Sequence, residues 1–203
     1  MLNNMKKIGE GWQYSVYDLQ NGRVLKKLHS LIKTYWVILK DIFPFNTDPI
    51  TKLPSYARNS KIKALASAEI LTKKNIPLSW LGNPKFINGL DYEQDKALPL
   101  HDVFTNSNTE QIKLLIDKFI IFNKQLMEIG VIDKSFNITK NYGLNNNGDV
   151  ILIDIGELFD NPVRIKKQLI DRAWDKSYVA GCIKNKEAQK YFIEKMDENF
   201  SVK

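Results

Sequence analysis

The stretch Val150-Ile151-Leu152-Ile153-Asp154-Ile155-Gly156 decides the fold that we expect for this chain of 203 residues. An apolar run that ends in Asp and Gly predicts a buried strand that delivers a carboxylate into a turn. Asn145-Asn146-Asn147-Gly148 predicts the turn of a hairpin with strands at 142–144 and 149–153. Asn141 stands thirteen residues before Asp154 (154 − 141 = 13). One carboxylate and one amide oxygen, completed by phosphate oxygens and water, suit Mg²⁺, although a capped hairpin with an Asp turn would show the same residues.

Two glycines near the N-terminus predict a second hairpin whose backbone can approach phosphate. Ile8-Gly9-Glu10-Gly11 is followed by Val16, in a segment rich in Tyr and Val. Without a Cβ atom, the glycines let backbone N–H groups come close to phosphate oxygens. Asn21-Gly22 predicts a tight turn that joins strands at 13–19 and 23–28. A plain β-hairpin is the simpler interpretation of these glycines taken alone.

A lysine on the second of these strands is the expected phosphate ligand. Lys26 ends the sequence Val24-Leu25-Lys26, and Lys27 would point to the opposite face of the sheet. A strand lysine that points into a cleft holds phosphates as a point charge. Glu69, on a helix expected from about Tyr56 to Lys74, is a candidate partner that would orient Lys26. The alternative for both residues is an ordinary solvated surface position.

The order of the expected elements predicts an α+β fold of two lobes. Strands come first, followed by the 56–74 helix, strands near 85–87 and 90–94, and a long helix from 108 or 109 to about 129. The hairpin that carries Asp154 and helices near 162–173 and 186–199 complete the chain. We therefore expect one domain over 1–203, with a small antiparallel-sheet N-lobe (1–95) and a reduced helical C-lobe (96–203). A helix at 30–43 and a loop at 48–54 would form an insertion in the N-lobe, near 30–54.

Helical periodicity also predicts which side of each helix is buried. On the 56–74 helix the expected buried face consists of Ile62, Leu65, Ala66, Ile70 and Leu71. On the long helix it consists of Ile112, Leu115, Ile116, Phe119, Phe122 and Leu126.

Together, these residues resemble the protein-kinase-like superfamily. The glycine pair with Val16 resembles its Gly-rich loop, and Lys26 resembles the lysine of its third strand. Asn141 resembles the metal-binding asparagine, and Asp154-Ile155-Gly156 resembles the Asp-Phe-Gly motif. The resemblance implies ATP and Mg²⁺ as ligands. It also implies that Tyr92-Glu93-Gln94 lies at the hinge between the lobes, where backbone groups hydrogen-bond adenine.

The sequence departs from the superfamily's pattern at the catalytic base. It contains no His-Arg-Asp triplet, and Phe136 stands five residues before Asn141 (141 − 136 = 5), where the base aspartate is usual. Asp133, eight residues before Asn141 (141 − 133 = 8), is the candidate base if a longer loop brings it to the acceptor. Tyr14 replaces the third glycine of the first loop, where it would crowd or cover the phosphates.

The segment after Asp154 also differs from the superfamily's pattern. Glu157 either adds a carboxylate to the metal site or stabilises the start of a helix. Only 49 residues follow Asp154 (203 − 154 = 49), and they contain no Ala-Pro-Glu segment. This leaves little room for a platform that binds a protein substrate, so a small molecule or a lipid is favoured as the acceptor.

Composition sets broad limits on partners and location. The formal charge is +7, from 30 Lys and Arg against 23 Asp and Glu, which suits anionic partners such as nucleotides but also serves solubility. Because a role in nucleic-acid binding would rest on this charge alone, nucleic acid is not an expected partner. The single cysteine, Cys182, excludes an intramolecular disulfide and fits a reducing compartment, so we expect a cytoplasmic location. Met1–Lys7 is polar, and no apolar segment is long enough to span a bilayer, so neither a signal peptide nor a transmembrane segment is expected.

Three functions stay open on the sequence. The leading hypothesis is an ATP-dependent phosphotransferase that acts on a small-molecule, lipid or protein hydroxyl. The second is a pseudokinase that binds nucleotide or a partner and acts as a regulatory module. The third is a nucleotidyl transferase that adds AMP. The sequence leaves open whether the domain is catalytically active, and it names neither the acceptor nor an oligomeric state.

Overall fold

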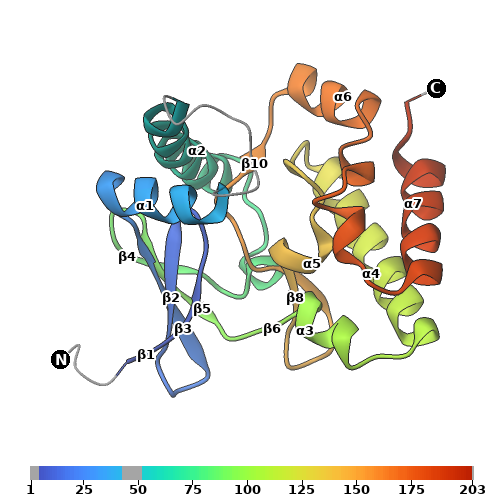
Figure 1. The fold of residues 1–203 in the computed structure, drawn as a ribbon, viewed down its shortest axis with the longest axis horizontal. Helices are drawn as coiled ribbons and strands as arrows, with labels where there is room; N and C mark the ends of the chain where they lie inside the picture. Colours follow the sequence, from blue (N-terminus) through green and yellow to red (C-terminus); the bar gives the residue numbers. More distant parts are fainter. Residues whose placement is uncertain (1–4, 43–51, 203) are drawn as a thin grey trace.

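The computed structural model describes residues 5–42 and 52–202, which form two lobes (Figure 1). The N-lobe contains an antiparallel sheet of five strands in the order β1-β2-β3-β5-β4. These strands are β1 Lys6–Glu10, β2 Tyr14–Asp18, β3 Arg23–Leu28, β4 Lys85–Asn88 and β5 Asp91–Asp95. The turn at Asn21-Gly22 joins β2 to β3 as expected, and Gly22 has φ +79°, a conformation that favours glycine.

Two helices of the N-lobe lie against each other beside this sheet (Figure 1). They are α1 Leu31–Ile42 and α2 Leu53–Lys73, and a short 3-10 helix, η2 Leu78–Leu81, follows. Most of the loop predicted at 48–54 lies outside the described residues, and α2 already begins at Leu53. Pro54 lies in the first turn of α2, where its missing N–H leaves no hydrogen bond unmade.

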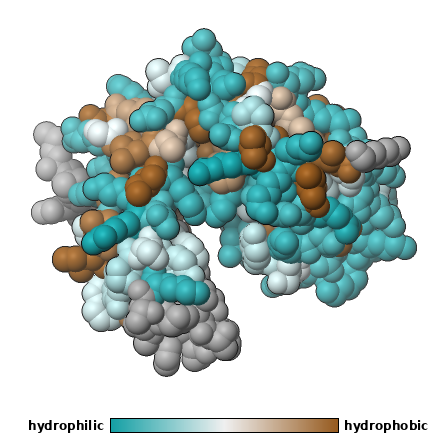
Figure 2. Space-filling view, turned by 90° about the horizontal axis from the view of Figure 1, so that it is seen from above, coloured by the Kyte–Doolittle hydropathy of each residue, from teal (hydrophilic) through white to brown (hydrophobic). Residues whose placement is uncertain are grey.

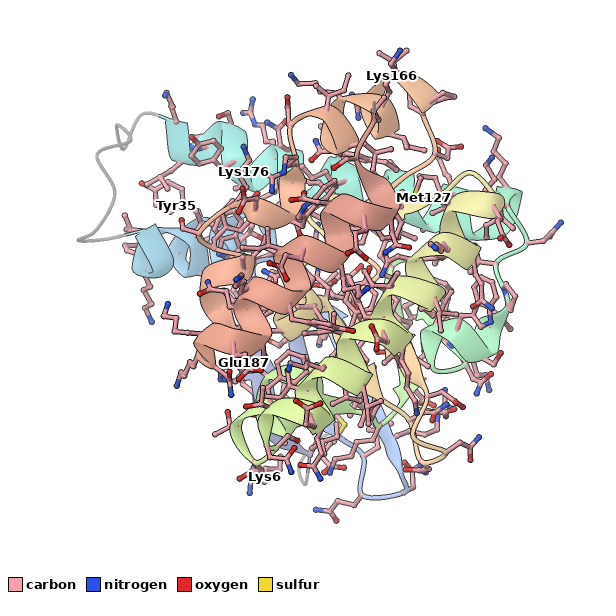
Figure 3. The ribbon with its side chains drawn as sticks, turned by 90° about the vertical axis from the view of Figure 1, so that its right-hand side faces the viewer. Lys6, Tyr35, Met127, Lys166, Lys176 and Glu187 are labelled. Atoms are coloured by element: carbon pink, nitrogen blue, oxygen red, sulfur yellow. The ribbon has the colours of Figure 1, made fainter. Side chains whose placement is uncertain are left out.

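The C-lobe is mainly helical. Its helices are α3 Leu100–Thr105, α4 Thr109–Glu128, α5 Ile138–Asn141, α6 Pro162–Ile170 and α7 Lys186–Phe200, with 3-10 turns η3 Ala173–Asp175 and η4 Ala180–Cys182. Figure 3 looks onto α4 and α7, which pack side by side and are joined by an ion pair of 2.6 Å between Lys113 Nζ and Glu187 Oε1. Asn108 caps α4 through a reciprocal pair of hydrogen bonds with Gln111, as the sequence predicts.

Short strands of the C-lobe lie at its boundary with the N-lobe. β6 Leu98–Pro99, β8 Tyr142–Leu144 and β9 Val150–Leu152 form one sheet in the order β6-β8-β9. β7 Ile132–Asp133 pairs with β10 Leu158–Phe159. At the boundary, β9 contacts η2 and β10 contacts α2. The chain crosses from the N-lobe to the C-lobe at residues 96–97, between β5 and β6. The expected α+β class with a small sheet lobe and a helical lobe is confirmed.

The buried face of α2 differs from the one that its apolar residues predict. Ile62 and Leu65 are exposed, at 60% and 47%. The buried residues are Leu53, Ala57, Ser60, Ala64, Ser67 and Ile70, so only Ile70 of the predicted face is buried. The prediction fails because the helix turns Ser60 and Ser67 inward. There the Ser60 carbonyl and the Ser67 hydroxyl accept hydrogen bonds from distant segments. On α4 the prediction holds, and only Leu115 of the expected face is partly exposed.

Viewed from above, the surface is mostly hydrophilic, and hydrophobic residues appear as separate spots (Figure 2). Across the described residues, every helix is too short or too polar to cross a membrane.

Candidate functional site

Lys26 reaches from the N-lobe sheet to the strand that carries Asp154. It lies on β3 between Val16 of β2 and Tyr92 of β5, on the sheet face that is turned toward the C-lobe. Its side chain is buried, and Nζ donates a hydrogen bond to the carbonyl oxygen of Ile153. The ring of Tyr92 lies 5.7 Å from Nζ, at a distance that suits a cation–π interaction. Lys27 is exposed on the other face, as the alternation of a strand predicts.

Burial and the charge of Asp154 act in opposite directions on Lys26. Burial lowers the pKa of the Lys26 ammonium, and the negative charge of Asp154 opposes this change. Asp154 is half-buried just after β9, and its Oδ1 accepts a hydrogen bond of 3.1 Å from the backbone N–H of Gly156. A buried lysine beside a carboxylate at a lobe boundary is an arrangement in which an added anion and cation would each find a partner.

Asn141 lies next to Asp154 because the backbone joins them. The carbonyl oxygen of Asn141 accepts hydrogen bonds from the N–H groups of Ile153 (2.8 Å) and Asp154 (3.1 Å). Its side-chain Nδ2 donates to Asp133 Oδ1 at 2.9 Å. This orientation leaves the amide oxygen Oδ1 of Asn141 available to a further donor or a cation.

Asp133 supports Asn141 from beneath and is fully buried. Its other oxygen, Oδ2, accepts a hydrogen bond of 3.2 Å from the backbone N–H of Asn137. Burial raises the pKa of the Asp133 carboxyl to about 7, against the hydrogen bond from Asn141, which lowers it. With an exposed fraction of 0%, Asp133 cannot touch an acceptor hydroxyl in this structure. The geometry therefore gives it a positioning contact to Asn141 in place of the contact expected of a base.

Phe136 belongs to the core of the C-lobe. It is fully buried and has φ +52°, and its ring packs against Trp174 and Phe200 at centroid distances of 5.8 and 5.7 Å. The position that would hold the base aspartate in the resembling superfamily is thus an aromatic anchor of the loop between β7 and Asn141.

The hairpin of β1 and β2 buries Tyr14 against Tyr92 and leaves room around its glycines. Gly9 pairs with Val16 across the hairpin, and a Cβ atom added to Gly11 would meet nothing within 4 Å. Tyr14 is buried, and its ring packs edge-on against Tyr92 at 5.4 Å. Burial and the charge of Asp154 raise the pKa of the Tyr14 phenol, so its ring lies within electrostatic range of that carboxylate.

Glu69 lies away from Lys26, and Tyr92-Glu93-Gln94 lies in the sheet beside Lys26 and not between the lobes. Glu69 is exposed on α2, and the hydrogen bond of Lys26 goes to Ile153, so the structure does not bring Glu69 and Lys26 together. Tyr92-Glu93-Gln94 lies within β5, whose residues pair with β3 and β4, and not at the crossing between the lobes. Glu93 lies 3.4 Å from Arg23, and Gln94 Nε2 donates to the carbonyl of Leu81 at 2.5 Å. The predicted position of the hinge at 92–94 is therefore wrong, because β5 continues to Asp95 and the chain passes to β6 only at residues 96–97.

Gln13, Lys63 and Lys134 lie beside the site and were not predicted there, whereas Glu157 was considered as a further carboxylate of the metal site. Gln13 Nε2 donates to the carbonyls of Ser60 (2.9 Å) and Gly156 (3.1 Å). Glu157 forms ion pairs with Lys63 on α2 (2.7 Å) and Lys134 (3.1 Å). Among these four residues, only Glu157 carried a signal in the sequence, which is its place directly after the Asp-Ile-Gly motif. Strand β10 follows Glu157, where a helix was considered.

Comparison with known proteins does not assign this chain to a family. No protein-family model matches this sequence, and no curated protein matches it. One solved structure that matches is the complex of Rv3197 with erythromycin from Mycobacterium tuberculosis, at 14% identity and a TM-score of 0.47. The match covers 95% of this chain and 53% of that protein, so the chain spans about half of its length.

Proposed function

We propose that this chain is a kinase-like domain that binds ATP with Mg²⁺ and transfers phosphate to a hydroxyl group. One observation carries the proposal: the fold brings Lys26, Asn141 and Asp154 together from three separate segments of the chain and from both lobes. A buried cation for phosphate, a carboxylate and a free amide oxygen for a metal are the groups that phosphoryl transfer uses. Positioning and electrostatics provide most of the catalysis in such reactions.

The residues fit a magnesium ion. Asp154 contributes a half-buried carboxylate, and the amide oxygen of Asn141 faces away from its hydrogen bond to Asp133. Mg²⁺ binds through one or two protein oxygens and completes its shell with water and phosphate oxygens. Bound there, the ion would neutralise charge on the phosphates.

Lys26 and the first hairpin would hold the phosphates. The carbonyl of Ile153 is a neutral partner for Lys26, and a phosphate is a stronger one because both groups are charged. Neither Gly9 nor Gly11 has positive φ, and the fold has space for a side chain at Gly11. The protein's own packing therefore does not require glycine at position 11, whereas close approach of a phosphate would. The adenine ring of ATP would lie near residues 96–97, where the chain crosses between the lobes.

A second function, nucleotide binding without phosphate transfer, is favoured by the position of the candidate catalytic base. Phe136 is in the core and Asp133 is fully buried, so a transferring domain must either open this loop or work with a poorly placed base. The acceptor of a transferring domain would be a small molecule or a lipid in preference to a protein. A nucleotidyl transferase stays a third candidate, and product mass separates it, because it adds AMP in place of phosphate.

Thermal unfolding with ATP, with and without Mg²⁺, tests the proposal. At a MgATP concentration near 100 times Kd, binding stabilises the folded state by ~2.7 kcal/mol, which for this size raises Tm by about 5–10 °C. Asp154→Asn should abolish the Mg²⁺-dependent shift, and Asp149→Asn, an exposed acid in the same hairpin, should retain it. A wild-type protein whose Tm ignores MgATP up to millimolar concentration would refute nucleotide binding. If binding is found, release of ADP and labelled product separates transfer from regulation.

A further inference from the structure

One side of α2 contacts Glu157 and Leu158 directly and is linked to Gly156 through Gln13. Gln13 links the carbonyl of Ser60 to that of Gly156. Lys63 Nζ lies 2.7 Å from Glu157 Oε1. Further along, the backbone N–H of Leu158 donates to Ser67 Oγ at 2.9 Å. Residues spaced by three and four positions share a helix face, so Ser60, Lys63 and Ser67 form one stripe on α2.

Glu157 extends this contact into the C-lobe. Its second oxygen lies 3.1 Å from Lys134 Nζ, and its carbonyl accepts a hydrogen bond of 3.0 Å from the Lys134 N–H. Lys134 is the neighbour of Asp133, which holds the amide of Asn141. A single carboxylate therefore connects α2 of the N-lobe to the segment that orients a candidate metal ligand.

The three charges are partly withdrawn from water. The side chains of Lys63, Glu157 and Lys134 are 34%, 30% and 33% exposed. Burial alone would raise the pKa of Glu157, but the charges of the two lysines outweigh it and lower the pKa. Glu157 is therefore a carboxylate at neutral pH, and without it two half-buried ammonium groups would face each other unpaired.

We propose that Glu157 is a positioning residue that fastens α2 to the segment carrying Asp154 and aligns Lys134 beside Asp133. Its partners are Lys63 and Lys134, whereas Lys26 is held by the carbonyl of Ile153. The consequence for ligand binding rests on the proposed nucleotide site, whereas the fastening of α2 does not.

Hydrogen exchange of the full chain without nucleotide tests the fastening directly. Glu157→Gln keeps the side-chain shape and removes the charge, and Lys63→Met removes the partner on α2. Each should speed exchange of residues 154–159 and of the first half of α2 by about tenfold, or ~1.4 kcal/mol. Glu69→Gln, an exposed acid on the same helix, should leave these rates unchanged. Rates in Glu157→Gln that equal those of the wild type would overturn the proposal.

A reversed ion pair separates positioning from a general loss of stability. The double variant Lys63→Glu/Glu157→Lys places a carboxylate on α2 between two lysines, so it should restore slow exchange, whereas either single reversal should not. A double variant that exchanges as fast as the single ones would contradict a role of the charge pair.

The dissociation constant of MgATP then measures the effect on the site. Glu157→Gln should weaken MgATP about tenfold, and the reversed pair should recover the affinity. Equal affinity of the wild type and Glu157→Gln would refute alignment of the site by Glu157. If exchange responds as described but no form binds MgATP, the fastening stands and the proposed function fails. If inorganic phosphate stabilises Glu157→Gln far more than the wild type and restores its slow exchange, an anion at this position is confirmed as the fastening element.

Discussion

Gly156→Ala is expected to destabilise the protein through one side chain, that of Gln13. A Cβ atom at position 156 would lie 1.7 Å from Gln13 Oε1 and 2.8 Å from its Cδ, so the Gln13 amide must leave. Its departure breaks two hydrogen bonds, to the carbonyls of Ser60 and Gly156, in a buried setting. At about 1 kcal/mol each, the loss is ~2 kcal/mol, which lowers Tm by about 4–8 °C for a chain of this length.

The same substitution in a Gln13→Ala background should have the opposite sign. Gln13→Ala already removes both hydrogen bonds and the clash with Gln13, and Gly156 does not have positive φ. The remaining tight contact of the new Cβ atom is with Asp154 Oδ1 at 3.3 Å, and the half-buried Asp154 side chain needs to shift by only a few tenths of an ångström to relieve it. Alanine then stabilises by ~0.5 kcal/mol, because it restricts the unfolded chain. Urea unfolding of the four proteins in this cycle should give a coupling energy of roughly 2.5 kcal/mol. A cost of Gly156→Ala that is the same in both backgrounds would show that Gln13 does not occupy this space.

The remaining predictions concern charge and burial. His29 is buried beside Ser15, and burial lowers its pKa, so the unfolded state takes up a proton near pH 6.5 before the folded state does. Stability from this group is present above pH 6.5 and falls as the pH drops below it, so the Tm advantage of the wild type over His29→Gln should shrink between pH 7.5 and 5.5; parallel curves would contradict this. Lys26→Met should remove the MgATP-dependent Tm shift while the protein stays folded, and a retained shift would exclude Lys26 as a phosphate ligand. Asp197→Ala should cost about 1–3 kcal/mol in urea unfolding, because Asp197 accepts from the indole N–H of fully buried Trp174 at 3.0 Å; Glu198→Ala, which loses only an exposed ion pair, should change stability by less than about 1 kcal/mol.

Local signals in the sequence predict the hairpin of β2 and β3 and the long helix α4 well. β3 spans 23–28 as predicted, because the Asn-Gly turn and the alternation of apolar residues fix its register. Asn108 marks the start of α4 because its side chain caps the helix wherever the rest of the chain lies. These elements depend on neighbours within a few residues, which a sequence shows directly.

The parts of the site that were misplaced depend on distant segments. Periodicity gives the spacing of a helix face but not its rotation, so Ile62 and Leu65 on α2 suggested the wrong side. The rotation is decided by partners such as Leu158, ninety-one positions from Ser67, and Gln13, forty-seven from Ser60. The burial that raises the pKa of Asp133 likewise comes from the packed fold and leaves no trace in the residues around it.

The aromatic rings that pack beneath the candidate site include one from α7, near the C-terminal end of the sequence. Phe136 leads out of the loop that precedes Asn141, and it rests on Trp174 and on Phe200, the last residue of α7. A fragment that ends before α7 would keep every proposed ligand of nucleotide and metal. It would lose Phe200, against which Phe136 of the loop before Asn141 packs. The aromatic ring at position 200 therefore supports the loop before Asn141, although it lies forty-six residues after Asp154 (200 − 154 = 46).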